Sequence, residues 1–258
     1  MGIEIEDLNL ILDNIKSHCP KKNKLLIIGN AELYFEKNLY EKLCIYKNFK
    51  LKKIAEPFDV FSLGYSLGFK NVETLDINGK ASLNLNLQNK LPKSQVSQYD
   101  FIIDSGVLFW CFDPGLALKN IYKMARKGGI LFHICALSGH YGTGYYNIHP
   151  KLFEDFYLSN KCIYINTSYR SKPKRLRYSW SYIKRKFFPL DSIINSSHSS
   201  IYENSGKIFL SRCSKNNIFF NSKQISNEPD LIPNKVVSIN VFKKTNDINP
   251  ISPLNLGV

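Results

Sequence analysis

Short apolar runs alternate with amphipathic segments along the first two thirds of the chain, and the clearest example lies at residues 99–135. Residues 101–103 are apolar and flanked by polar positions, a pattern that predicts a short strand buried on both faces. Asp113 and Pro114 then supply an N-cap and a first helical residue, and the apolar side chains that follow repeat at helical spacing. A second apolar run, residues 130–135, predicts another buried strand.

The end of this predicted helix is marked by charge and by glycine. Lys123, Arg126 and Lys127 place positive charge in the expected last turn, where the helix dipole favours it, and Gly128-Gly129 is expected to end the helix. A strand, helix and strand of this length predict a right-handed crossover between two parallel strands. An open α/β sheet is therefore the expected fold.

The same periodicities predict further elements on both sides of this unit. Helices are expected over residues 3–18, within residues 36–70, and from His149-Pro150 onward. Strands are expected at residues 25–29, 72–76, 81–91, 162–166, 207–213 and 236–242.

Composition limits the class of protein. At 258 residues, with 44% hydrophobic content, the chain is long enough for one sizeable domain with an extension. No apolar run approaches the ~20 residues of a membrane span. The acidic N-terminus does not resemble a secretory signal, and Glu6 stands where a myristoylation motif has Ser or Thr. These features predict a cytoplasmic protein.

The cysteines do not form a metal or disulfide pattern. None of the six belongs to a C-x-x-C pair, and most lie within apolar runs, so they are expected to be buried free thiols in a reducing compartment. They are Cys19, Cys44, Cys111, Cys135, Cys162 and Cys213.

The net charge of +14 changes the list of expected partners. A charge of this size favours polyanions, although a lysine-rich solvated surface accounts for it equally well. Basic and aromatic residues interleave over residues 169–188, where they suit nucleic acid, an anionic membrane or a solvated helix. The basic members of this segment are Arg170, Lys172, Lys174, Arg175, Arg177, Lys184, Arg185 and Lys186.

Two segments resemble motifs of a known family. Residues 99–113, YDFIIDSGVLFWCFD, are followed by a predicted helix, Lys-x-Gly-Gly and a strand, and residues 143–150 read TGYYNIHP. Together they resemble class I S-adenosylmethionine-dependent methyltransferases. They are most similar to the methyltransferase type 11-like bacterial and phage branch, and the resemblance covers residues 24–168.

The resemblance implies a Rossmann-like fold. The expected architecture is an open, mostly parallel seven-stranded sheet with helices on both faces, completed by an antiparallel seventh strand, and a C-terminal basic extension follows. Residues 1–168 would form the cofactor-binding core with its N-terminal helix. Residues 169–258 would form the extension, with the basic aromatic segment, one or two sheet strands and an irregular tail.

The same resemblance implies that the cofactor is S-adenosylmethionine and suggests where it binds. A carboxylate that ends the second strand suits two ribose hydroxyls, and an asparagine can both donate to and accept from the edge of adenine. The glycines let the backbone approach the cofactor closely. The expected cofactor-binding residues are Gly29, Asn30, Asp76, Ile77, Asn86, Leu87, Asp104, Ser105 and Gly106.

The motifs also depart from the branch, which has Glu-His where this chain has Phe109-Trp110 and a later histidine where it has Thr143. His133, His140 and His149 are candidates for a substitute base. Tyr141, Tyr145 and Tyr146 are expected to form an aromatic wall for the acceptor, although these side chains also suit simple packing of the loop. The predicted catalytic residues are His140, Tyr145, Tyr146 and Asn147.

Several chemistries are disfavoured by what the motifs lack. The Asn-Pro-Pro-aromatic tetrad of amino-methylating DNA enzymes is absent, and no Pro-Cys nucleophile follows a strand. The leading hypothesis is a methyltransferase acting on a small-molecule or glycan acceptor. One alternative is a non-catalytic binding protein on the same fold that holds nucleic acid or another polyanion through its basic segment. A nucleotide- or sugar-nucleotide-dependent transferase is the third.

Overall fold

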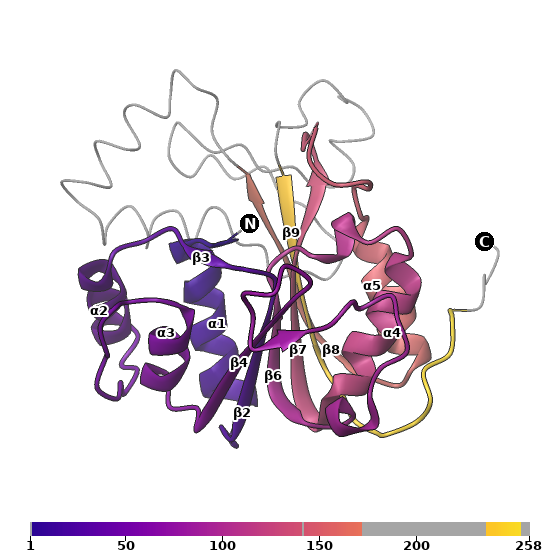
Figure 1. The fold of residues 1–258 in the computed structure, drawn as a ribbon. Helices are drawn as coiled ribbons and strands as arrows, with labels where there is room; N and C mark the ends of the chain where they lie inside the picture. Colours follow the sequence, from indigo (N-terminus) through magenta and orange to yellow (C-terminus); the bar gives the residue numbers. More distant parts are fainter. Residues whose placement is uncertain (1, 141, 172–235, 254–258) are drawn as a thin grey trace.

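The computed structural model describes residues 2–140, 142–171 and 236–253, which build a central sheet with helices on both faces (Figure 1). The sheet has seven strands in the order β5-β4-β2-β6-β7-β9-β8. Every neighbouring pair is parallel except those that involve β9, which runs antiparallel to both β7 and β8. The predicted Rossmann-like architecture is confirmed, and β9 is its antiparallel seventh strand.

The strands and helices are short and mostly follow the predicted ranges. The strands of the large sheet are β2 (Lys24–Ile28), β4 (Asn71–Asp76), β5 (Leu83–Asn84), β6 (Tyr99–Asp104), β7 (Ala125–Ser138), β8 (Ile163–Ser171) and β9 (Val236–Lys243). A two-stranded sheet pairs β1 (Gly2–Ile3) with β3 (Glu32–Leu33). The helices are α1 (Ile5–His18), α2 (Lys37–Tyr46), α3 (Val60–Ser66), α4 (Pro114–Met124) and α5 (Pro150–Ser159), with single 3-10 turns η1 (Lys93–Gln95) and η2 (Leu108–Trp110).

Each face of the sheet carries its own hydrophobic core, because successive strand residues point to opposite faces. On β2, Leu25 and Ile27 pack with α1, α2 and α3 on one face. Leu26 and Ile28 pack with α4 and α5 on the other face. Helices therefore cover both faces, as Figure 1 shows with α1, α2 and α3 on one side and α4 and α5 on the other. The expected continuous apolar runs reflect this burial on two sides.

The start of α4 is as predicted, but its end is not. Asp113 caps the helix by accepting a 2.8 Å hydrogen bond from the backbone N–H of Leu116. The helix ends at Met124, and β7 begins directly at Ala125, so Arg126 and Lys127 belong to the strand. The reason is local: Ala125 is buried and pairs with Tyr99, and Arg126 forms an ion pair with Asp100. These contacts hold the segment in the sheet.

The third strand is also shorter than predicted. Residues 81–91 alternate in polarity, yet only Leu83–Asn84 pair with β4. The side-chain oxygen of Asn86 accepts from the backbone N–H of Gln88, and its carbonyl accepts from Asn89. Asparagine stabilises such turns through its own side chain, and this turn ends the pairing. The strand predicted at 207–213 lies outside the described residues.

Two strands of the large sheet include described residues that follow residue 168. β8 continues to Ser171, and β9 returns from the C-terminal part of the chain to lie between β7 and β8. The division at residue 168 stays a prediction, but its boundary falls inside β8. Of the basic aromatic segment, residues 172–188 lie outside the described residues.

Arg170, which the sequence places in that basic segment, is instead part of a buried ionic cluster. Its guanidinium donates to both carboxylate oxygens of Asp7, at 3.0 and 3.1 Å, and lies 2.8 Å from Glu4. Asp7 also accepts from the backbone N–H of Glu4, which caps α1. The charge of Arg170 therefore joins α1 to β8, and polyanion binding through residues 169–188 stays a prediction.

The five cysteines within the described residues are free and buried, as predicted, and Cys213 lies outside them. Burial raises the pKa of Cys111 to about 11, with the charges of Asp104 and Asp113 acting in the same direction. A nucleophilic thiolate at this position is therefore disfavoured. Across the described part of the chain, no helix combines the length and hydrophobicity that crossing a bilayer requires.

Candidate functional site

The strand order of the sheet reverses at β2, beside the carboxyl ends of β2 and β6. From β2 the chain goes to β4 and β5 on one side, and then returns to β6 on the other side. In open α/β sheets, ligands bind at the carboxyl ends of the strands where the order reverses in this way. Gly29 directly follows β2, and Ser105 and Gly106 follow β6.

Backbone and side-chain hydrogen bonds hold the three loops at this edge together. The N–H of Gly29 donates to the carbonyl of Leu75 at 2.7 Å, and the N–H of Asn30 donates to Asp76 at 2.8 Å. On the other side, the hydroxyl of Ser105 donates to the carbonyl of Ile28 at 2.7 Å. The structure thus brings together predicted residues from the ends of β2, β4 and β6.

Two glycines of this edge adopt a backbone conformation that other residues rarely reach. Gly29 has φ +96° and Gly106 has φ +95°. A Cβ atom on Gly29 would lie 2.9 Å from both the Ser105 hydroxyl oxygen and a methyl group of Val107. Glycine is required at position 29 for both conformation and space, although the loop carries none of the further glycines that dinucleotide-binding loops have.

Asp76 is half-buried, and its carboxylate shapes the loops on each side of it. One oxygen accepts from the backbone N–H of Asn30, while the other accepts from Ile77 at 2.6 Å and Asn78 at 3.1 Å. A carboxylate oxygen accepts two hydrogen bonds, so the oxygen that faces Asn30 retains acceptor capacity. The side chain of Ile77 is 69% exposed, beside this carboxylate.

Asn86 and Leu87 lie further along the same edge, in the loop after β5. The side-chain oxygen of Asn86 is already bonded to Gln88, as described above. Leu87 is buried, and its carbonyl accepts from the side chain of Asn120 on α4 at 2.7 Å. Leu87 therefore anchors the loop in the core on the α4 side.

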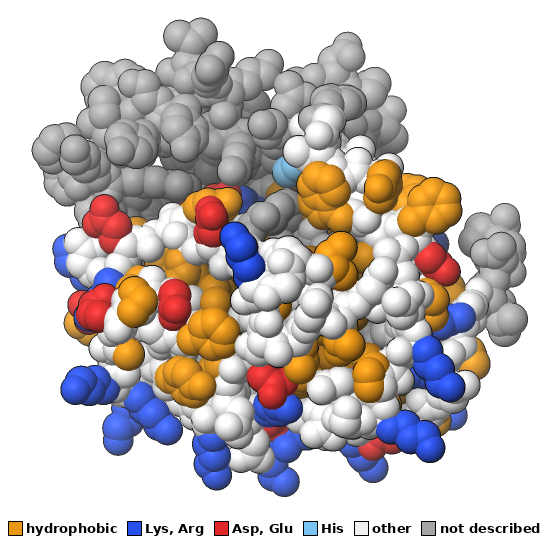
Figure 2. Space-filling view, in the orientation of Figure 1, with side chains coloured by type: hydrophobic (Ala, Val, Ile, Leu, Met, Phe, Trp, Pro, Cys, Tyr) orange, Lys and Arg blue, Asp and Glu red, His pale blue; other side chains and the backbone are white. Residues whose placement is uncertain are grey.

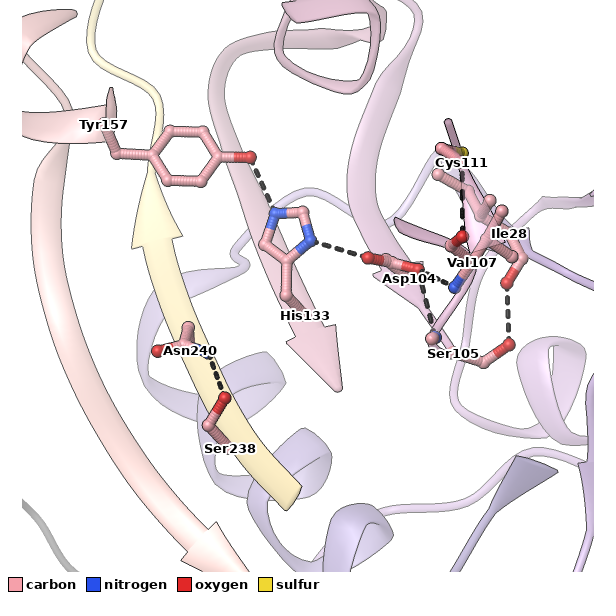
Figure 3. A network of polar contacts seen from close by, with 10 residues as sticks. Ile28, Asp104, Ser105, Val107, Cys111, His133, Tyr157, Ser238 and Asn240 are labelled. Carbon is pink, nitrogen blue, oxygen red and sulfur yellow. Dashed lines mark hydrogen bonds and ion pairs between the residues drawn. The ribbon is translucent and has the colours of Figure 1, made fainter. Parts of the chain in front are cut away.

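Asp104 and His133 form a buried pair that reaches α5 through Tyr157 (Figure 3). His133 Nδ1 lies 3.0 Å from Asp104 Oδ2, and His133 Nε2 lies 2.6 Å from the Tyr157 hydroxyl. All three side chains are fully buried. A carboxylate only accepts, so Nδ1 donates to Asp104, and Nε2 accepts from Tyr157. Burial raises the pKa of Tyr157 well above its ordinary value, which keeps this hydroxyl protonated.

The other carboxylate oxygen of Asp104 accepts from the backbone N–H groups of Gly106, at 3.0 Å, and Val107, at 2.8 Å. Asp104 therefore fixes the loop after β6 from inside and has no surface that a ligand can touch. His133 is likewise buried, so the hypothesis that it serves as a substitute base was wrong. Asp104 and His133 are register partners on adjacent parallel strands. The sequence analysis did not identify Tyr157 as the third member of this network.

A second polar contact continues this row across the sheet. Asn240 on β9 is the register partner of His133, and it accepts from the hydroxyl of Thr167 on β8 at 3.2 Å. The side-chain amide of Asn240 donates to Ser238 at 3.1 Å (Figure 3). Buried polar groups need such partners, and here four adjacent strands each contribute one side chain to the row.

The two motif segments pack against each other above β6 and β7. The carbonyl of Phe109 accepts from the N–H groups of Tyr145, at 2.7 Å, and Tyr146, at 3.3 Å. A Cβ atom on Gly144 would overlap the ring of Phe109. Phe109 stands where the similar methyltransferase branch has glutamate. It is fully buried, so its side chain packs residues 144–146 against the loop after β6.

Large aromatic side chains remain exposed around this contact, and Figure 2 shows hydrophobic side chains gathered on this part of the surface. The exposed fractions are 51% for Trp110, 77% for Phe112, 67% for Tyr145 and 41% for Tyr146. The Tyr146 hydroxyl donates to the carbonyl of Phe112 at 3.1 Å, and the rings of Phe112 and Tyr145 meet edge to face. We call these four residues the aromatic rim.

The polar candidates of the same loop separate into two groups. His140 lies beside the aromatic rim, with its ring centroid 6.4 Å from that of Phe109, and Asn147 is exposed. His149 instead caps α5, because its Nδ1 accepts from the backbone N–H of Lys151. That bond explains His149 without a catalytic role. Tyr141 lies outside the described residues.

Among the described residues, no group of three or more His, Cys, Asp or Glu side chains is placed to hold a metal ion. No protein-family model matches the sequence. A search of curated proteins also finds no similar chain.

Solved structures with a similar fold do exist. The YcgJ protein from Bacillus subtilis matches with a TM-score of 0.43 and 13% identity, over 93% of this chain and 99% of that one. A putative methyltransferase from Bacillus halodurans matches with a TM-score of 0.45 and 9% identity, over 92% and 99%. A SAM-dependent methyltransferase from Archaeoglobus fulgidus matches with a TM-score of 0.43 and 12% identity, over 92% and 93%. Likeness at this level does not assign an activity.

Proposed function

We propose that this chain binds S-adenosylmethionine at the carboxyl ends of β2, β4 and β6 and transfers its methyl group to a small-molecule or glycan acceptor. One observation carries the proposal: the strand order reverses at β2 while β9 runs antiparallel between β7 and β8. That arrangement is the one implied by the resemblance of residues 24–168, and it places the predicted cofactor residues at one edge of the sheet.

The residues at this edge suit the cofactor chemically. Gly29 and Gly106 carry no side chain directly after β2 and β6, where we propose that the methionine part of the cofactor binds. Asp76 keeps acceptor capacity for ribose hydroxyls, with Asn30 and Ile77 beside it, and Ser105 follows β6 at the same edge. Asn86 and Leu87 would line the adenine end of the site. Asp104 acts as a positioning residue, because its carboxylate orients the N–H groups of Gly106 and Val107.

The cofactor supplies an activated methyl group, so the protein's task is to align the acceptor and to remove a proton where the acceptor carries one. His140 is the base of this proposal, because His133 is buried and His149 caps a helix. Tyr145 and Tyr146 would hold the acceptor, with Asn147 donating to it or accepting from it. The aromatic rim supports an acceptor with a ring or an apolar face, since exposed aromatic side chains stack on such surfaces.

Methyl transfer is tested by incubating the full chain with S-adenosylmethionine and panels of small molecules and glycans while measuring release of S-adenosylhomocysteine. We expect turnover with an acceptor from one of these panels. His140→Gln should then lower kcat at least about hundredfold while cofactor affinity stays unchanged. His149→Gln is the matched control and should retain most of the activity. Cofactor binding without turnover on any acceptor would favour the non-catalytic alternative.

A further inference from the structure

The edge of the sheet opposite the proposed cofactor site carries two hollows that share one lysine. This edge holds the amino ends of the parallel strands and the end of β9. A hollow of about 400 Å³ lies between the turn after α1 and the start of β7. A second one, of about 640 Å³, lies between α1 and the first half of β8. Lys243, the last residue of β9, lines both of them.

The smaller hollow is strongly positive. Its charged residues are four cations, Lys21, Arg126, Lys127 and Lys243, and one acid, Asp100, which gives a formal charge of +3. Asp100 does not offer its charge to solvent, since it is buried and accepts from the backbone N–H groups of Asn23 and Lys24 at 2.9 and 2.8 Å. The hollow therefore has more positive charges than the acids lining it can neutralise.

Asp100 also orients one of these cations. Its other oxygen pairs with the terminal nitrogen of Arg126, while the buried Nε of Arg126 has no hydrogen-bond partner among the described residues. A guanidinium held in a fixed direction loses less conformational freedom when it binds a phosphate. Arg126 is thus prepared for an anion.

Positive charge continues beyond the hollow along the same edge, where Figure 2 shows lysine and arginine side chains in a row. Lys22 reaches the carbonyl of Leu67 at 3.0 Å, and the N–H of Lys70 donates to the carbonyl of Lys22. Burial lowers the pKa of Lys22, and the nearby charge of Lys52 lowers it further. A row of cations of this length suits several phosphates better than one.

The larger hollow is lined mainly by hydrogen-bonding groups, and its one acid, Asp13, is paired with Lys47 at 2.8 Å. Asn14, Ser17, His18 and Asn166 line it together with Lys243. Asn166 is only 8% exposed, and its side-chain oxygen has no hydrogen-bond partner among the described residues. A buried acceptor without a partner is unfavourable, and a donor on a ligand would satisfy it. Asn166 and Lys243 line the same hollow, so a hydrogen-bond acceptor and a cation that can bind phosphate both face it.

We propose that this edge binds single-stranded nucleic acid, with backbone phosphates on Lys21, Arg126, Lys127 and Lys243 and a sugar or base in the hollow lined by Asn166. One cationic hollow beside one hydrogen-bonding hollow suits a phosphate and the nucleoside attached to it. The site lies at the opposite edge from the proposed cofactor site and uses no residue of the segment 172–188, and it does not depend on the methyltransferase proposal.

The test measures binding of a fluorescent single-stranded RNA of about twelve nucleotides to the full chain at ~50 and ~200 mM salt. Each neutralised phosphate contributes roughly −0.7 to the slope of log affinity against log salt, so four contacts predict a slope near about −3. Lys21→Gln combined with Lys127→Gln and Lys243→Gln should weaken binding at least about tenfold and flatten the slope by about 2.

The matched control combines Lys42→Gln, Lys90→Gln and Lys119→Gln, which removes the same charge outside both hollows. It should leave the slope unchanged, whereas an equal effect of both triple variants would overturn the proposal. Asn166→Leu should weaken binding without changing the slope.

Four further results would contradict the site. The first is no binding at ~50 mM salt. The second is equal competition by a dinucleotide and the longer strand, which would indicate a site for a single phosphate. The third is binding of phosphatidylserine vesicles in place of RNA. The fourth is loss of the salt slope only when Lys172, Lys174, Arg175 and Arg177 are replaced by Ser.

Discussion

Asp104 Oδ2 lies 3.0 Å from His133 Nδ1, and this buried contact joins the last residue of β6 to the interior of the adjacent parallel strand β7. The carboxylate holds the loop on one side through Gly106 and Val107, while the imidazole is held in turn by Tyr157 on α5. The position of the loop after β6 is therefore linked to the packing of α5 against the sheet.

Tyr157→Phe removes only the hydroxyl that donates to His133, and it should lower the free energy of unfolding by about 1–3 kcal/mol, because a buried acceptor is left unpaired. His133→Phe should cost more, about 3–5 kcal/mol, since it leaves the Asp104 carboxylate without its donor. Urea unfolding measures both values. Tyr46→Phe, at a half-exposed tyrosine of α2, is the control and should change stability by less than about 0.5 kcal/mol. Unchanged stability of Tyr157→Phe would show that the network is absent in solution.

Asp76→Ala should weaken binding of S-adenosylhomocysteine at least about tenfold, because it removes the acceptor for ribose hydroxyls and releases the N–H of Asn30. Isothermal titration calorimetry gives the affinity. Glu73→Ala removes a carboxylate from the other end of the same strand, where it pairs with Lys24, and should leave the affinity unchanged. Equal affinities for wild type and Asp76→Ala would take Asp76 out of the site.

Gly29→Ala should destabilise the protein by about 1–3 kcal/mol, because it places a side chain at φ +96° against Ser105 and Val107. Gly79→Ala separates the two causes, since Gly79 has φ +74° but no atom within 4 Å of an added Cβ. If thermal unfolding shows a larger loss of stability for Gly29→Ala than for Gly79→Ala, the difference measures the steric crowding against Ser105 and Val107. We further expect Gly106→Val to reduce cofactor affinity more than Gly29→Ala does.

Arg170→Met should destabilise the fold by about 3–5 kcal/mol at neutral pH, because it removes the cation that neutralises the buried Asp7 carboxylate and Glu4. Replacing Asp7 with Asn in the same chain should recover part of the loss, since the remaining buried group is then neutral. A double variant no more stable than Arg170→Met alone would argue against this ionic cluster.

The same cluster predicts a pH dependence. Burial, opposed by Arg170, raises the pKa of Asp7 from 3.8 to about 6, so the folded protein binds more protons than the unfolded chain between these values. Stability from this group therefore falls as pH rises from about 4 to about 6. Without Arg170 the folded pKa rises further, so Arg170→Met should differ least from wild type near pH 4 and progressively more above pH 6. A constant difference across this range would contradict the assignment.

Much of the fold was predictable because burial on two faces leaves a strong mark on a sequence. The apolar runs at β2, β6 and β7 and the Asp113-Pro114 helix start were correctly identified. The errors fall where a local pattern is overruled by a distant contact. Arg126 and Lys127 look like the end of a helix, yet pairing of Ala125 with Tyr99 starts a strand there.

The candidate site was predictable only in part. Loops that follow parallel strands must meet at one edge, so Gly29, Asp76 and Gly106 were expected together. The sequence did not indicate that Asp104 points inward, that His149 caps a helix or that Arg170 is paired with Asp7. The partner of Arg170 is distant in the sequence and only the folded chain brings it near, whereas the partners of Asp104 and His149 are two or three residues away and were overlooked.

The central claim is that the carboxyl edge of β2, β4 and β6 binds S-adenosylmethionine, and the melting temperature of the full chain with S-adenosylhomocysteine tests it most directly. A ligand that binds only the native state stabilises it by about 2.7 kcal/mol when its free concentration is about 100 times its Kd. For a domain of this size, that corresponds to a rise in melting temperature of about 5–10 °C. We predict such a rise in the wild type and its loss in Asp76→Ala. No shift with S-adenosylhomocysteine, together with a clear shift by a sugar nucleotide, would contradict the account.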